Sequence, residues 1–424
     1  MSMPDFLPEE NAGFLRHTGL RAIFDSLESA GGEVRVNGGA VRNALLGEKV
    51  VDVDLSTTLL PGHVIECLQR SRIKTIPTGI EHGTVTAIAD GRAFEITTLR
   101  EDIETDGRRA IVSFGTDWRA DAMRRDFTMN ALYCDRNRRL FDPLQGYGDL
   151  AARIVRFIGV PESRIAEDRL RILRFFRFFA WYGSDRPDAE GLKACAKMRS
   201  GLLDLSAERI WRELKKLLEA PDPTRALLWM RTTKILSLVL PETDRWGIDL
   251  MGDLVVSCSD AGEVPDPLLR LMAIIPPNIA RIDPLASRLK LSRSETDRLS
   301  EWARLNERSE PLVFAGSDRE PLTHTVFRLG RQPVLDQLRL MRARAWQKGD
   351  AGEVRQLQET IEFCADWDIP QFPVSGQDLL ALGHQPGLEL GRLLSRLKEN
   401  WIQSDFTATR AELLALHSKA DRSG

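Results

Sequence analysis

The sequence predicts an α+β protein in which a small mixed-sheet head is followed by an all-helical remainder. Segments with the alternation of β-strands are confined to the stretch from Glu33 to about Asp142. From Gly146 onward, helical patterns follow one another to the end of the chain. A run of strands followed by a run of helices is typical of α+β architecture, and this order carries the prediction.

Each element of the head has its own signal. Residues 8–31 are expected to form an N-terminal helix, which Gly31-Gly32 would end. Alternating apolar and polar residues then predict strands at 33–37, 50–55, 73–77, 84–88 and 93–99. Between these strands, the patterns predict helices at 40–46 and 61–70.

Breaks in the later helical pattern predict how the rest of the chain is divided. Asp222-Pro223 marks one break, and further prolines interrupt the helices beyond it. We expect four segments, namely a head at 1–148, a helical neck at 149–222, a helical body at 223–310 and a helical tail at 311–424.

Composition narrows the class of protein. The chain has 424 residues, of which 42% are hydrophobic and 29% are charged, as in ordinary soluble proteins. No run approaches 18 consecutive apolar residues, so no membrane span is expected, and the N-terminus lacks the features of a secretory signal. Five scattered cysteines without a C-x-x-C pattern fit a reducing, cytoplasmic compartment and argue against structural zinc.

Positive charge is concentrated locally although the net charge is −3. Five arginines lie between Arg164 and Arg177, and Arg119, Arg124 and Arg125 form a second cluster. Charge confined to a few places favours a site that binds phosphates over a general polyanion-binding surface.

Asp52 and Asp54 are the most informative residues of the head. In the strand predicted at 50–55, a period of two places both carboxylates on one face and the apolar residues on the other. Carboxylates at this spacing repel each other unless a cation lies between them, and hard oxygen ligands suit Mg²⁺. A lone D-x-D is most often a pair of solvent-facing or turn aspartates, so the motif needs support from its neighbours.

That support precedes the aspartates. Gly38-Gly39 would let the backbone approach a phosphate, the helix that follows presents its N-terminus to an anion, and Arg42 adds a positive guanidinium. A Gly-Gly pair alone is equally weak. Together the two motifs predict nucleotidyl transfer on a two-metal site.

Two further motifs each allow two interpretations. Glu95, in the strand predicted at 93–99, is either an exposed strand residue or a third carboxylate that acts as base toward an incoming hydroxyl. The stretch 124–130 is predicted to start a helix, where Asp126 or Thr128 would cap it and the arginines would be solvated. Alternatively, Arg125 binds the phosphates of a triphosphate.

The stretch from Glu167 to Arg177 is predicted to be one helix with an arginine stripe. Asp168 and Arg171 are three residues apart, so they would present an acceptor and a donor together. A surface ion pair is the common meaning of this spacing. The specific alternative is recognition of cytosine and adenine, each of which has an exocyclic amine beside an acceptor, whereas uracil and guanine do not.

Taken in order, these motifs resemble the CCA-adding enzymes, the tRNA nucleotidyltransferases of class II, a class that also includes bacterial poly(A) polymerases. The resemblance holds in order and spacing from about residue 33 to 218 and returns in the tail. The matching segments are Gly38–Arg42, Asp52–Asp54, Arg124–Asn130, Phe141–Gly146, Glu167–Arg177, Ser206–Leu214, Gly376–Leu380 and Gly387–Gly391.

The resemblance implies specific roles for these residues. Asp52 and Asp54 would be catalytic and hold Mg²⁺. The nucleotide would be bound by Gly39, Arg42, Arg125, Asp168, Arg171, Arg174 and Arg177. The neck would recognise the base and the tail would bind tRNA, with CTP and ATP as further partners and no DNA. One departure is visible, because Asn43 stands where the family usually has Asp after the arginine.

Within the family, the resemblance favours CCA addition. Residues 105–110 look like the flexible loop of CCA-adding members, and we expect this loop to move between CTP addition and ATP addition. The basic stretch usual in the poly(A) polymerases is replaced by 73–82, and no long basic C-terminal extension is present. A poly(A) polymerase, a partial CC- or A-adding enzyme, or a non-catalytic RNA-binding protein of the same fold remain as alternatives.

Overall fold

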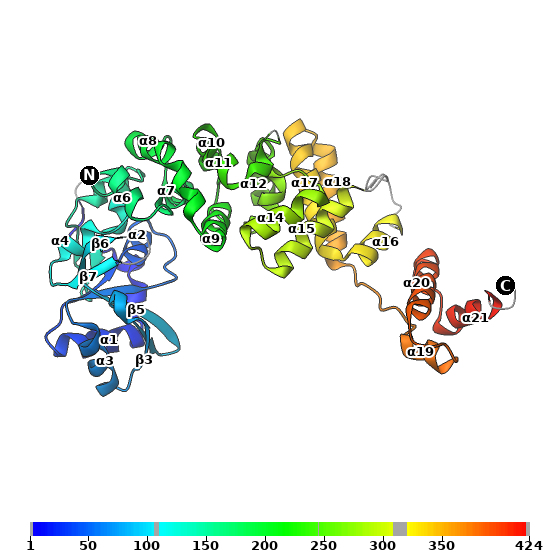
Figure 1. Cartoon of the computed structure of the whole chain (residues 1–424), viewed down its shortest axis with the longest axis horizontal. Coiled ribbons are helices and arrows are strands. Elements are labelled where there is room, and N and C mark those ends of the chain that lie inside the picture. Colours follow the sequence, from blue (N-terminus) through cyan, green and yellow to red (C-terminus); the bar gives the residue numbers. More distant parts are fainter. Residues whose placement is uncertain (1–2, 106–109, 245, 308–319, 421–424) are drawn as a thin grey trace. The chain divides into compact units, whose positions relative to one another are not determined.

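The computed structural model describes residues 3–105, 110–244, 246–307 and 320–420. The chain divides into two compact units, Met1–Pro241 and Glu242–Gly424. The first unit contains the sheet and the helices of the predicted head and neck, and the second unit contains helices within its described residues (Figure 1). The finer division into four segments stays a prediction.

A seven-stranded mixed sheet forms the centre of the head, in the order β3-β4-β5-β2-β1-β8-β9. The pair β2–β5 is parallel, and every other neighbouring pair is antiparallel. The strands are β1 Val34–Asn37, β2 Asp54–Thr57, β3 Lys74–Gly79, β4 Thr84–Ala89, β5 Arg92–Thr98, β8 Tyr133–Cys134 and β9 Leu140–Phe141. The predicted fold class is therefore confirmed.

Two helices cover one part of this sheet. The helix α1 (Thr18–Ser29) packs against β4 and against α3 (Pro61–Arg70), and α3 also contacts β3 and β4 (Figure 1). Both helices are amphipathic, and their buried apolar residues face the sheet. The third helix of the head, α2 (Gly39–Leu45), follows β1 directly and carries Arg42 toward the candidate site.

The prediction of one N-terminal helix over 8–31 is wrong. Two 3₁₀ turns, Glu9–Asn11 and Gly13–Arg16, precede the α-helix, which begins only at Thr18. Pro8 has no N–H to donate and Gly13 has low helix propensity, so the first turns stay short. The C-terminal boundary agrees with the sequence, because Gly31 adopts a positive φ of 83° after the helix ends.

The predicted strand at 50–55 is also shifted. The strand β2 begins at Asp54, and Asp52 lies in the irregular segment before it. Val51, expected on the buried face, is 69% exposed, whereas Val53 and Leu55 are buried. Pairing decides the start, because β1 offers partners only from Val34 to Asn37, opposite Thr57 to Asp54.

A second, two-stranded sheet was not predicted. It is formed by β6 (Arg100–Thr105) and β7 (Ala110–Phe114), which pair in antiparallel fashion. The predicted flexible loop at 105–110 lies between these two strands in the sequence, and its residues 106–109 lie outside the described part of the chain.

The rest of the first unit is helical. The helix α7 packs against α9 and α10, and aromatic residues on its buried face contact Phe127 and Phe157. The helices are α4 Trp118–Met123, α5 Gly146–Ala151, α6 Pro161–Glu167, α7 Arg171–Tyr182, α8 Ala189–Lys197, α9 Ala207–Leu218, α10 Thr224–Thr232 and α11 Ile235–Val239.

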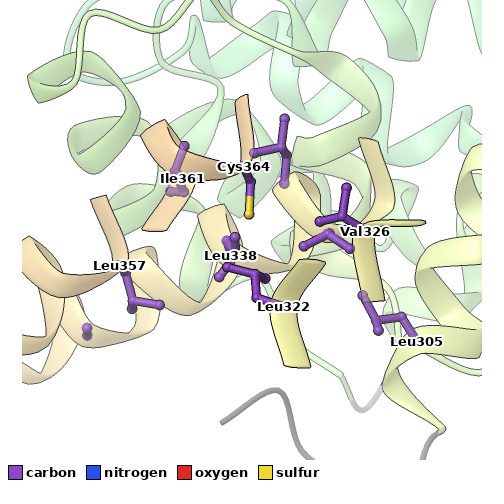
Figure 2. Close-up of a cluster of buried hydrophobic side chains, with 10 residues drawn as sticks. Leu305, Leu322, Val326, Leu338, Leu357, Ile361 and Cys364 are labelled. Atoms are coloured by element: carbon purple, nitrogen blue, oxygen red, sulfur yellow. The ribbon is translucent and has the colours of Figure 1, made fainter. Parts of the chain in front are cut away.

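The second unit is built around α17, which packs against α12, α15, α16 and α18. Its described helices are α12 Leu250–Asp260, α13 Pro267–Ile274, α14 Ile279–Leu289, α15 Arg293–Asn306, α16 Glu320–Leu329, α17 Arg331–Lys348, α18 Ala351–Asp366, α19 Gly376–Ala381, α20 Leu388–Gln403 and α21 Arg410–Ala420. Figure 2 shows the side chains of one core gathered between these helices, among them Leu322, Leu338 and Ile361.

A second apolar cluster joins the last helices, with Leu379, Leu397 and Trp401 among its buried members. None of the helices in the described ranges is long and apolar enough to cross a membrane.

Candidate active site

A cavity of about 530 Å³ opens in the first unit beside the start of β2. Its size is within the usual range for small-molecule sites. Its lining is Asn37, Gly38, Gly39, Arg42, Asp54, Arg124, Arg125, Asp126, Asn130, Asp168, Leu170, Arg171, Arg174, Phe178 and Arg209. Six arginines against three aspartates give a site that attracts a polyanion such as a triphosphate.

One carboxylate of the predicted D-x-D motif, Asp54, lines this cavity. Asp54, at the first position of β2, is directly opposite Glu95 in the parallel pairing with β5. Burial, which disfavours the charged form, and next the charges of Glu95 and Asp52 raise the pKa of Asp54 to about 6. The charge of Arg125 lowers this pKa in part. A cation stabilises neighbouring carboxylates that would otherwise repel one another, so the oxygen atoms of these carboxylates fit a hard divalent metal ion.

The carboxylates do not form a complete metal cage. Within the described residues, no group of three or more His, Cys, Asp or Glu is placed to hold a metal ion.

Arg125 is held at the cavity by buried polar groups. Its guanidinium donates to Asn37 Oδ1 at 3.0 Å and to Asp121 Oδ2 at 3.0 Å, and its Nε donates to the Tyr133 hydroxyl at 3.2 Å. Tyr133 in turn donates to Asp121 at 2.8 Å. Burial would raise the pKa of Asp121, but Arg125 and then Arg124 lower it, so Asp121 stays charged behind the site.

Arg42 is buried with neutral partners. It donates to the Asn130 amide oxygen at 2.5 Å and to the Tyr182 hydroxyl at 2.7 Å, and it lies over the Tyr182 ring at 4.0 Å. Asn43 Oδ1 accepts from both Nε and Nη2 of Arg42, at 3.1 and 2.9 Å. The unusual Asn43 therefore keeps the contact with Arg42 but leaves its charge unneutralised.

The two glycines keep the backbone clear beside these arginines. Gly38 has a φ of 58°, a conformation that side chains disfavour, and a Cβ there would lie 3.4 Å from Nη1 of Arg125. A Cβ on Gly39 would lie 3.6 Å from Nη2 of Arg42. Both distances are ordinary van der Waals contacts, so the need for glycine comes from the positive φ of Gly38.

Asp168 and Arg171 both line the cavity, but the prediction that they share one helix is wrong. The helix α6 ends at Glu167, Asp168 is extended, and α7 begins at Arg171. Asp168 accepts from the backbone N–H of Leu170 at 3.0 Å, which fixes the chain at the break. The carboxylate also stabilises the start of α7, since anions are favourable at helix N-termini.

Their charges are paired elsewhere. Both Asp168 oxygens accept from Nη2 of Arg209, at 3.0 and 2.8 Å. Arg171 donates to Glu167 at 2.5 Å and to the carbonyl oxygen of Arg124 at 3.1 Å. The donor and acceptor edges therefore face the cavity from two separate ion pairs.

The predicted helix start at 124–130 is wrong, and so is the capping role for Asp126 or Thr128. The helix α4 ends before Arg124, and the 3₁₀ turn Thr128–Asn130 has no side-chain cap. Asp126 is instead buried and accepts from Nε of Arg174 at 2.8 Å and from the Asn130 amide at 2.9 Å. Burial opposes its charge, but Arg174 and then Asn130 lower the pKa of Asp126 to about 2.

Arg177 is not part of the cavity lining. Its Nε donates to Glu213 of α9 at 2.6 Å. The arginines predicted to form one stripe on α7 therefore have different surroundings. Arg174 lines the cavity, whereas Arg177 links α7 to α9.

Comparison with known proteins identifies the family. The Poly A polymerase head domain model matches residues 34–156, and the model described as a probable RNA and SrmB-binding site of polymerase A matches residues 186–246. The mitochondrial CCA tRNA nucleotidyltransferase 1 of Mus musculus is 37% identical over 415 residues, covering 95% of this chain and 90% of its own. This chain belongs to the CCA-adding enzyme family.

Bacterial relatives and solved structures agree with this membership. The CCA-adding enzyme of Pediococcus pentosaceus is 30% identical over 418 residues, covering 95% of this chain and 98% of its own. The Bacillus stearothermophilus CCA-adding enzyme, solved in complex with CTP, shares the fold with a TM-score of 0.72 at 23% identity, covering 98% of this chain and 100% of its own. The resemblance inferred from the sequence is therefore confirmed.

Among the residues proposed for this nucleotidyltransferase, most lie together. Gly39, Arg42, Asp54, Arg125, Asp168, Arg171 and Arg174 line one cavity, whereas Asp52 and Arg177 do not. Sequence reasoning missed Arg209, Asn130 and Asn37 as cavity residues. Arg209 and Asn130 lie inside segments that carry the resemblance, so their place in those motifs was the available signal; Asn37 had none beyond its position before Gly38.

Proposed function

We propose that this enzyme adds CCA to the 3′ end of tRNA from CTP and ATP without a nucleic-acid template, releasing pyrophosphate. The observation that carries the proposal is the meeting of Asp54 and Glu95 with an arginine-lined cavity in a chain of the CCA-adding family. A cavity with this charge suits a triphosphate, and the carboxylates suit the metal that accompanies it.

Asp52 and Asp54 would hold the metal, and we propose Mg²⁺. When bound, the metal supplies activation of the tRNA 3′ hydroxyl and neutralisation of the triphosphate. Arg125 and Arg42 would bind the phosphates, and the network behind Arg125 would keep its guanidinium in place. Glu95, opposite Asp54 in the sheet, is the candidate to accept the proton of the attacking hydroxyl.

Asp168 and Arg171 are proposed to recognise the base. Asp168 would accept from the exocyclic amine of cytosine or adenine, and Arg171 would donate to the neighbouring ring acceptor. Asp168 keeps acceptor capacity for this contact on Oδ2, which accepts from Nη2 of Arg209, whereas Oδ1 accepts from both Arg209 and the Leu170 N–H. Arg174 would support the site from its pair with Asp126.

The partners and the compartment follow from this activity. We propose tRNA as the acceptor, bound by the helices of the neck, body and tail through shape and phosphate contacts. The five free cysteines favour a reducing compartment, and we propose the cytoplasm, although vertebrate relatives are named mitochondrial.

The decisive experiment supplies tRNA ending at the discriminator base with each labelled nucleotide alone and then with CTP and ATP together. The proposed function requires CTP alone to give two additions and both nucleotides to give three. Long adenosine tails would identify a poly(A) polymerase, and addition limited to C or A would identify a partial enzyme. Binding of tRNA without any incorporation would leave only a non-catalytic RNA-binding role.

A further inference from the structure

Trp246 is the most exposed tryptophan of this protein. All nine tryptophans lie in described parts of the chain, and Trp246 alone is in the exposed class, with 44% of its surface accessible. Its indole N–H has no acceptor among the described residues. Tryptophan is highly buried on average, so an exposed indole beside a cavity suggests a surface that binds another molecule.

The cavity beside it lies wholly in the second unit and has a volume of about 310 Å³. Its lining is Trp246, Gly247, Asp249, Leu250, Ala273, Arg344, Gln347 and Lys348. Leu250 and Ala273 add apolar surface to that of the Trp246 indole, so a planar ring could pack against this part of the cavity lining. Gln347 is already committed, because its amide donates to the Asp249 carbonyl and the Asp253 carboxylate, at 3.3 and 3.0 Å.

Two cationic residues of α17, Arg344 and Lys348 near its C-terminal end, line the same cavity. Arg344 is exposed and makes no hydrogen bond or ion pair with any described residue. Lys348, four residues later on the same helix face, is 4.0 Å from Glu353 and is itself largely exposed. Asp249 is the single carboxylate of the lining, so a free triphosphate would meet repulsion there as well as attraction.

We propose that this cavity binds one unpaired nucleotide of an RNA. The base stacks on Trp246, and the adjoining phosphates contact Arg344 and Lys348. Aromatic surfaces flanked by cations bind unstacked bases in this way, and the base faces are recognised without dependence on sequence. The inference rests on the proposed function in naming tRNA as the RNA, and it adds a contact remote in sequence from the catalytic residues.

Equilibrium binding of tRNA lacking its CCA end, measured without nucleotides over a series of salt concentrations, tests the proposal. Trp246→Ala is expected to weaken binding roughly tenfold with an unchanged salt slope, whereas Trp246→Phe keeps most of the affinity. Arg344→Gln and Lys348→Gln are each expected to lower the slope of log K against log salt by about one. Arg355→Gln is the matched control, because Arg355 is also exposed and forms no ion pair with the residues that the structure describes, but it lies outside the cavity.

Wild-type affinity in Trp246→Ala together with a wild-type salt slope in Arg344→Gln would overturn the proposal and would leave the cavity to a different class of partner. If Trp246→Ala folds poorly, the salt dependence of binding by Arg344→Gln still tests the proposal, because the exposed Arg344 can be changed without disturbing the core. Failure of the proposed function is distinguishable, because it would change or abolish the pattern of incorporation while these differences in RNA binding persist.

Discussion

Among single residues, Asp54 carries the carboxylate that lines the cavity at the start of β2. Asp54 is surrounded by Glu95 and Asp52, and its pKa is raised to about 6, so its ionised form is destabilised in the metal-free fold. Functional carboxylates commonly carry such a cost in stability, which supports the metal-binding role proposed for Asp54.

Asp54→Ala is therefore expected to abolish nucleotide incorporation while leaving folding intact. Removing a like charge should leave the melting temperature unchanged or slightly higher above pH 6, because the ionised carboxylate no longer opposes its neighbours. Incorporation in Mg²⁺ and thermal unfolding are measured on the same preparation. Activity above a few per cent of wild type would show that Asp54 is not a metal ligand.

Asp168→Ala tests base recognition. Loss of a charged hydrogen bond to the exocyclic amine should cost about 1.5–3 kcal/mol of discrimination against UTP and GTP. Arg209→Ala is the matched control, because it removes the partner that holds Asp168 but keeps the acceptor. If both variants lose discrimination equally, or if Asp168→Ala slows every nucleotide alike, Asp168 only positions the site.

Asn43 decides how Arg42 is held. Asn43→Ala removes the oxygen that accepts two N–H groups of a buried guanidinium, so stability should fall by about 1–3 kcal/mol and the KM for CTP should rise. Asn43→Asp keeps that oxygen and adds a partner charge, so it should unfold no earlier than wild type. Urea unfolding and initial rates measure both effects. Wild-type stability in Asn43→Ala would mean that Asn130 and Tyr182 suffice.

At the scale of elements, α4 and β8 meet behind the cavity and hold Arg125. The helix supplies Asp121, which is fully buried, and the strand supplies Tyr133. Neither residue lines the cavity, so both act through the arginine as positioning residues.

Asp121→Asn should lower kcat strongly, because Arg125 loses its charged partner, whereas Tyr133→Phe should cost only about 0.5–1.5 kcal/mol for one hydrogen bond. Binding of tRNA should stay near wild type in both variants, which separates misplacement of Arg125 from loss of the fold. The split between kcat and tRNA affinity is the measurement, with Asp121→Glu as the conservative variant. Parallel loss of tRNA binding and kcat would make the network structural.

At the scale of the whole molecule, Asp126 connects the head to α7 through Arg174, and this contact makes the first unit sensitive to acid. The pKa of Asp126 is lowered to about 2 in the fold, so its contribution is complete above about pH 4 and is lost as the pH falls toward 2. The shift corresponds to about 2 kcal/mol. The difference in unfolding free energy between wild type and Asp126→Asn should shrink by roughly half between pH 5 and pH 3. A difference independent of pH in that range would contradict this assignment.

Much of the architecture was available from local pattern. The helix predicted at 61–70 and the strands near 34–37, 84–89 and 92–98 agree with the structure, because alternation and helical periodicity report burial directly. The motif residues were also identifiable, since Gly38-Gly39, the D-x-D and the arginines recur in a fixed order.

Tertiary structure decided which charges meet. The α-helical spacing of Asp168 and Arg171 predicted that these two residues pair. The chain breaks between α6 and α7, and Asp168 instead forms an ion pair with Arg209, 41 residues later in the chain. Asp126 was expected to cap a helix and instead neutralises Arg174, 48 residues away. Sequence by itself determined the fold class and the family, and it named seven of the fifteen residues that line the cavity. Their partners could not be predicted, because ion pairs between distant segments depend on how elements pack and carry no local periodicity.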